Sequence, residues 1–133
     1  MRLAFFTLLI LYGCSPHSLS EFRKEGQSRS VLFANDLKKI ETREQLLLSE
    51  PILRKHFESL VDLMIEAREF LKFHPDDVAT DTFFVEIQLE EQLKRIYRIE
   101  GGREIVERAQ REPLIRLDAY ERTLAHKKEN YKN

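Results

Sequence analysis

The chain has 133 residues, 42% of them hydrophobic, which is enough for one domain with a packed core. Its 22 Lys and Arg nearly balance 23 Asp and Glu, and the formal net charge of −1 argues against a nucleic-acid-binding protein. Because Gly and Pro number only four each, and the long periodic stretches are rich in Leu, Glu, Arg, Lys and Gln, the composition predicts an all-α fold.

The first residues have the layout of a signal peptide. Arg2 provides one positive charge, and an apolar run from Leu3 to Tyr12 follows it, interrupted only by Thr7. Ten helical residues rise about 15 Å, roughly half of a hydrocarbon core of about 30 Å, so this run is too short to remain as a spanning helix. We therefore expect residues 1–13 to be a cleaved signal peptide.

The segment Leu11-Tyr12-Gly13-Cys14 resembles the lipobox of bacterial lipoproteins, in which Leu stands three positions before the cysteine and a small residue directly precedes it. Tyr12 departs from the small or aliphatic residue usual at its position. The resemblance covers residues 1–14 only. It implies lipidation of Cys14, with diacylglycerol on the thiol and a fatty acid such as palmitate on the amine, and therefore a membrane as partner. The alternative interpretation is a buried apolar segment with a free thiol at Cys14.

Two consequences follow from an acylated Cys14. It is the only cysteine, so its acylation would leave no thiol for a disulfide. The following residue, Ser15, is not Asp and so resembles the outer-membrane class of enteric-type lipoproteins. The resemblance thus implies a location in the bacterial cell envelope, at the outer membrane if the host has one and otherwise at the plasma membrane.

Residues 14–30 are expected to be the lipidated cysteine and a short tether, because they contain Pro16, Gly26 and five serines. Ser18 followed by Glu21 fits a capping box, so a short helix can start within this segment. The helical domain is expected to occupy residues 31–133.

Apolar residues at intervals of three and four predict the helices of this domain. A first helix is expected from Val31 to Leu48, and a second one is expected to have Pro51 in its first turn. The second helix should continue to about Leu71, and the sequence His74-Pro75-Asp76-Asp77 should stop it.

A third helix is expected to begin after a cap at Thr80 or Asp81 and to run to about Glu100, with Gly101-Gly102 as its stop. Its apolar residues cover more than one face, among them Phe83 and Phe84, which predicts that it is the central helix. The last segment, residues 103–128, contains Pro113 and is predicted to form either one bent helix or two. The expected architecture is an antiparallel bundle of four or five helices.

Acidic and basic residues four positions apart predict ion pairs along the helix surfaces. They are Glu50/Arg54, Glu90/Lys94, Glu91/Arg95, Glu104/Arg108, Glu107/Arg111, Glu112/Arg116 and Asp118/Arg122.

Motifs for catalysis or cofactor binding are not recognisable in the sequence. None of the four histidines stands three or four residues from another His, and Cys14, three residues before His17, is expected to carry the lipid, which argues against a zinc site. His74, Asp76 and Asp77 form the one compact polar cluster that could hold a cation, although the same residues fit a helix stop and cap. No nucleophile motif, phosphate loop or dinucleotide fingerprint occurs, so we expect no catalytic residue and no cofactor besides the covalent lipid.

These observations favour a membrane-anchored, non-enzymatic envelope protein whose helical domain binds another protein or supports an assembly. One alternative is a module that holds a small apolar or lipid ligand between its helices, because Phe residues are concentrated near positions 83 and 84. Another is an envelope hydrolase that uses paired carboxylates, since 23 acidic residues allow many such pairs.

Overall fold

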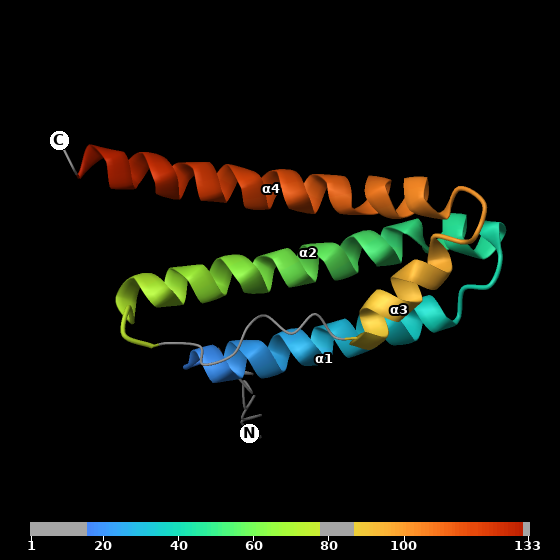
Figure 1. The fold of residues 1–133 in the computed structure, drawn as a ribbon, viewed down its shortest axis with the longest axis horizontal. Coiled ribbons are helices and arrows are strands. Elements are labelled where there is room, and N and C mark those ends of the chain that lie inside the picture. Colours follow the sequence, from blue (N-terminus) through green and yellow to red (C-terminus); the bar gives the residue numbers. More distant parts are fainter. Residues whose placement is uncertain (1–15, 78–86, 132–133) are drawn as a thin grey trace, which may run out of the picture.

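The structure, a computed structural model, describes residues 16–77 and 87–131. These residues form four α-helices: α1 (Leu19–Lys38), α2 (Arg43–Phe73), α3 (Ile87–Ile96) and α4 (Gly102–Asn130). The described ranges contain no β-strand, and the expected all-α helical bundle is confirmed (Figure 1). Cys14, Thr80, Asp81, Phe83 and Phe84 lie outside the described residues.

Helix α2 is the middle helix of the molecule, with α1 on one side and α4 on the other (Figure 1). Helices α1 and α2 are antiparallel, because the ring of Phe22 near the start of α1 lies 5.6 Å from that of Phe70 near the end of α2. Further along α1, Phe33 lies 5.0 Å from Phe57. The expectation that the third helix is the central one is therefore wrong for its described part, α3, which packs against α1, and the second helix takes that place.

Helix α4 runs parallel to α2, in contrast to the antiparallel direction of α1. Arg108 near the start of α4 pairs with Glu50 near the start of α2, and Glu121 further along α4 pairs with Arg68 further along α2. In chain order α3 stands between α2 and α4, and in space it packs against α1 near the end where α2 begins (Figure 1). The antiparallel packing expected from the sequence thus applies to the α1–α2 pair.

The core lies where all four helices meet, at the end of the molecule where α1 ends and α2 and α4 begin. Phe33, Leu53 and Val106 are among its fully buried side chains. Away from this end, α4 packs mainly against α2, and several apolar side chains of α2 are only half buried. The complete buried cluster comprises Phe33, Ala34, Leu37, Ile40, Leu46, Leu53, Leu89, Ile96, Ile105, Val106 and Ala109.

Helix α1 begins at the cap that Ser18 and Glu21 predicted, but it is a long helix rather than a short one within a tether. The tether was expected to reach Ser30, but the helix starts at Leu19, and the hydroxyl oxygen of its N-cap, Ser18, accepts a hydrogen bond from the Glu21 amide at 3.2 Å. Phe22, one turn into the helix, is 8% exposed because it packs against α2. Only residues 15–18 therefore separate Cys14 from the first helix.

The boundary between the first two helices also differs from the expected one. A helix from Val31 to Leu48 is wrong, because α1 ends at Lys38 and α2 begins at Arg43. Thr42 and Gln45 form a capping box in which each side chain accepts a hydrogen bond from the other's backbone N–H, both at 3.2 Å. Pro51 lies within α2 rather than in its first turn.

The last two expected boundaries concern glycine and proline. Gly101 has φ of 72° and ends the turn after α3, as expected for a glycine stop. Helix α4 then runs from Gly102 to Asn130 as one helix that includes the buried Pro113. Among the described residues, none of the helices is long and apolar enough to cross a membrane.

Candidate functional site

The cluster His74, Asp76 and Asp77 lies at the end of α2, where its polar groups serve helix ends. The His74 amide donates to the Phe70 carbonyl at 3.1 Å, and its ring stacks on Phe70 with 4.1 Å between centroids. Asp77 accepts a hydrogen bond at 3.3 Å from the amide of Leu19, the first residue of α1. Among residues 16–77 and 87–131, no group of three or more His, Cys, Asp or Glu side chains is arranged to hold a metal ion.

A second candidate is a half-open groove of about 340 Å³ between the end of α1 and the beginning of α2. Its floor includes the buried Ile40 and Leu53, while Leu48 and Ile52 on its rim are 82% and 49% exposed. The two exposed side chains and the apolar floor together form a small apolar surface that a binding partner could cover. The residues that line this α1–α2 groove are Asp36, Lys39, Ile40, Gln45, Leu48, Ser49, Ile52 and Leu53.

One side of the α1–α2 groove contains a carboxylate–imidazole pair. His56 Nε2 lies 2.7 Å from Asp36 Oδ2, and its ring stacks on Phe33 with 4.7 Å between centroids. The hydrogen bond from His56 lowers the pKa of Asp36, although partial burial acts in the opposite direction. The Ser49 hydroxyl, which also lines the groove, donates to the Gln45 carbonyl of its own helix at 2.7 Å.

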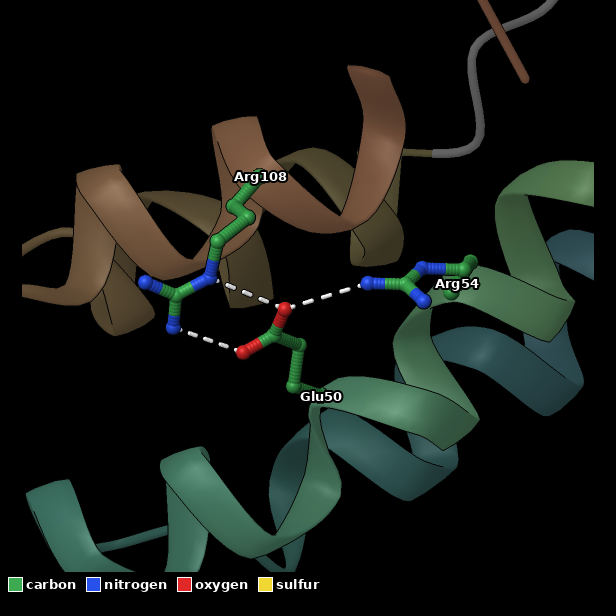
Figure 2. A network of polar contacts seen from close by, with 3 residues as sticks. All are labelled: Glu50, Arg54 and Arg108. Carbon is green, nitrogen blue, oxygen red and sulfur yellow. Dashed lines mark hydrogen bonds and ion pairs between the residues drawn. The ribbon is translucent and has the colours of Figure 1, made fainter. Parts of the chain in front are cut away.

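The contact between α2 and α4 contains a series of ion pairs. In one of them Glu50 pairs with two arginines, Arg54 and Arg108 (Figure 2). Both carboxylate oxygens of Glu50 accept hydrogen bonds from Arg108, at 2.9 and 2.6 Å, and one of them is also 3.2 Å from Arg54. The hydrogen bonds from Arg108 are the main cause of the lowered pKa of Glu50. This two-pronged pairing sets the register between the starts of the two helices.

The same contact continues along both helices towards their C-terminal ends. Arg116 pairs with Asp62 at 2.6 Å and also donates to a backbone carbonyl of α2. Further along, the Tyr120 hydroxyl donates to the carboxylate of Glu69, and Lys72 Nζ lies 5.3 Å from the centre of the Tyr120 ring. These contacts hold α4 against α2, and we assign them a structural role.

Three arginines, two in the α2–α4 contact and one on α3, have partners other than those expected from the sequence. Glu50/Arg54, Glu90/Lys94 and Asp118/Arg122 form as expected within single helices. Arg108 and Arg116, however, form ion pairs with α2. Arg95, on α3, donates to the carbonyls of Leu37 and Ile40 at the end of α1, at 2.5 and 2.7 Å. No signal in the spacing distinguishes these arginines from the others.

The α1–α2 groove was not expected from the sequence either. The sequence pattern placed Leu48 at the end of one helix and Ile52 near the start of the next. In the structure both residues lie in α2. The Thr42–Gln45 capping box was the signal that could have placed them correctly. Comparisons of the chain with protein-family models, with curated proteins and with solved structures give no match.

Proposed function

We propose that this protein is a non-enzymatic lipoprotein of the bacterial cell envelope, anchored through Cys14, whose helical domain binds another protein. The observation that carries the anchor is the order of features in residues 1–14: one positive charge, a short apolar run, and Leu11-Tyr12-Gly13-Cys14. The short distance between Cys14 and α1 is consistent with a domain held close to a membrane.

The anchor is tested with the variant Cys14→Ser. Cells labelled with a fatty acid should incorporate the label into the wild-type protein but not into this variant. The variant should also stay unprocessed or leave the membrane fraction, because a serine hydroxyl does not replace the thiol that carries the lipid. Ser15→Ala is the matched control and should remain labelled and membrane-bound. A Cys14→Ser protein that is still processed and still attached to membranes would refute the anchor.

The α1–α2 groove supports protein binding by the helical domain. Leu48 and Ile52 present apolar surface to water, and the polar residues Asp36, Lys39 and Gln45 surround the apolar floor. Protein–protein interfaces usually combine apolar side chains with polar residues around them, and the lining of this groove has both. The groove lies next to buried core residues of both helices, Leu37 of α1 and Leu46 and Leu53 of α2, so it is presented on a packed support.

A photo-crosslinking amino acid at position 48 tests this part of the proposal in intact membranes. It should give one discrete adduct, whereas the same amino acid at the exposed Glu112 of α4 should give none. The adduct should disappear when Ile52→Asp places a charge in the groove. If positions 48 and 112 give the same products, or if position 48 gives none, the groove is not a protein-binding site.

The groove also favours a second candidate function, the binding of a small apolar molecule. Its volume of about 340 Å³ lies at the lower end of the range typical of ligand pockets, and its floor is apolar. Native mass spectrometry of the full chain should then show an adduct that Ile52→Asp removes. Protein binding remains the preferred proposal because the groove is half open and Leu48 extends into solvent.

A further inference from the structure

Three helices, α1 by its start and α2 and α4 by their ends, point to the end of the molecule opposite to the core (Figure 1). The start of α1 is joined to the chain after α2 by the hydrogen bond from Leu19 to Asp77. Helix α4 points to this same end of the molecule, because it runs parallel to α2 and Tyr120 contacts Glu69 and Lys72, and its last turns extend past α2 (Figure 1). We call this group, which comprises the start of α1 and the ends of α2 and α4, the tether end.

The tether end is also where the chain leads to Cys14. Residues 15–18 separate Cys14 from Leu19, and five steps of extended chain span at most about 18 Å. A lipid on Cys14 would therefore keep the start of α1 within about 18 Å of the anchor point. The end of α2 would be held near the bilayer with it, because Asp77 and Phe70 contact the start of α1, and α4 points to the same side because it runs parallel to α2.

Exposed aromatic and basic side chains occur at this end. Phe73, the last residue of α2, is 79% exposed, and Tyr131, directly after α4, is 91% exposed. Counted from the level where Tyr120 meets Glu69, α4 continues about 10 Å beyond the end of α2, so Tyr131 projects outward. Lys127 and Lys128, also exposed, lie in the last turn of α4.

We propose that the tether end rests on the lipid bilayer, with Phe73 and Tyr131 inserted at the level of the headgroups. Aromatic side chains favour that level, and lysines beside them are attracted to anionic lipid phosphates. The α1–α2 groove then points away from the membrane, because Leu48 lies about 38 Å from Phe73 along α2. This inference rests on the proposed lipid anchor and adds an orientation to it.

The absence of tryptophan from the chain provides a clean test. Phe73→Trp and Tyr131→Trp each introduce a single fluorophore at the tether end, and Leu48→Trp introduces one at the other end of α2. All three positions are highly exposed, so the substitutions should not disturb folding. The full-length proteins are recovered from membranes and reconstituted into phosphatidylethanolamine–phosphatidylglycerol vesicles with or without brominated acyl chains.

Brominated lipid should quench tryptophan at positions 73 and 131 severalfold more than at position 48, with a blue shift of the emission at the first two positions. Equal quenching at 73 and 48 would mean that α2 lies flat on the bilayer, and this would overturn the inference. Absence of quenching at 73 and 131 in a membrane-attached protein would overturn it as well.

Failure of the anchor is measured separately, by the intact mass of the same preparations. If Cys14 carries no lipid, the proposed anchor is wrong. The Cys14 thiol is then coupled to a maleimide lipid in the same vesicles, so that quenching at positions 73 and 48 still decides whether the tether end contacts the bilayer. If Cys14 carries the lipid but the quenching pattern is not the expected one, only the orientation is wrong and the proposed anchor is unaffected.

Discussion

At the scale of single residues, Phe33 shows how packing between α1 and α2 is achieved. Its side chain is fully buried, and its ring contacts the rings of His56 and Phe57 from α2, with one stacked and one edge-on geometry. The same contact places His56 against Asp36, so the buried ring also supports the polar side of the α1–α2 groove.

Removal of the Phe33 ring should therefore be costly. Phe33→Ala should lower the free energy of unfolding by about 3–5 kcal/mol, because it deletes a large buried side chain and leaves a cavity. The neighbouring Leu32 is 61% exposed, and Leu32→Ala should change the same quantity by no more than about 0.5 kcal/mol. Urea unfolding followed by circular dichroism measures both values, and similar values for the two variants would contradict the assigned core.

At the scale of elements, two glycines in helices differ in whether the structure has room for a side chain at their position. Gly26 lies inside α1, where an added Cβ would meet Leu63 Cδ2 at 3.4 Å, an ordinary contact distance. Gly102 begins α4, where an added Cβ would meet the Ile96 carbonyl oxygen at 2.0 Å. The turn between α3 and α4 is therefore closed so tightly that it requires a glycine, whereas α1 does not.

Alanine substitutions at these two positions should have opposite effects on stability. Gly26→Ala should raise the free energy of unfolding by about 0.5–1 kcal/mol, because alanine restricts the unfolded chain and favours the helix. Gly102→Ala should lower it by more than that amount, because the backbone around Ile96 must shift. Thermal unfolding of both variants checks the signs. A stable Gly102→Ala protein would show that the turn after α3 is looser than described.

At the scale of the whole molecule, carboxylates connect helices to one another. Asp36 joins α1 to α2 through His56, and Glu50 joins α2 to α4 through Arg108. Both carboxyl groups have a folded-state pKa below the ordinary values of 3.8 for Asp and 4.5 for Glu. Their contribution to stability is therefore complete above these ordinary values and is lost as the pH falls through the lowered folded-state pKa values.

The protein should accordingly lose stability in acid through these two contacts. The free energy of unfolding of the wild type should fall as the pH decreases from about 5 to about 3. The double variant Asp36→Asn and Glu50→Gln should be less stable at neutral pH and should show a flatter decline, because it has two fewer carboxylates to protonate. Identical slopes for the two proteins would show that these contacts do not contribute to the pH dependence.

Local sequence signals predicted the helical class, the stop after α2 and the glycine stop before α4. These features depend on residues near one another in the chain: the apolar spacing, the His74-Pro75 step and the positive φ of Gly101. The helix start at Ser18 was predicted, but only for a short helix, because the serines and Gly26 indicated a tether. Packing of Phe22 against α2 outweighs that local preference. The expected boundary between Leu48 and Pro51 was wrong because the Thr42–Gln45 capping box already starts α2.

The sequence by itself determined that the described chain is helical, where most of its helices stop, and which short N-terminal segment indicates a lipid anchor. Only the tertiary structure decided that α4 runs parallel to α2, that α2 is the middle helix, and that Arg95, Arg108 and Arg116 reach across to other helices. The physical reason is that a helix end or an apolar stripe depends on residues that are close together in the chain. A long guanidinium can reach either its own helix or a neighbouring one, and packing decides between them.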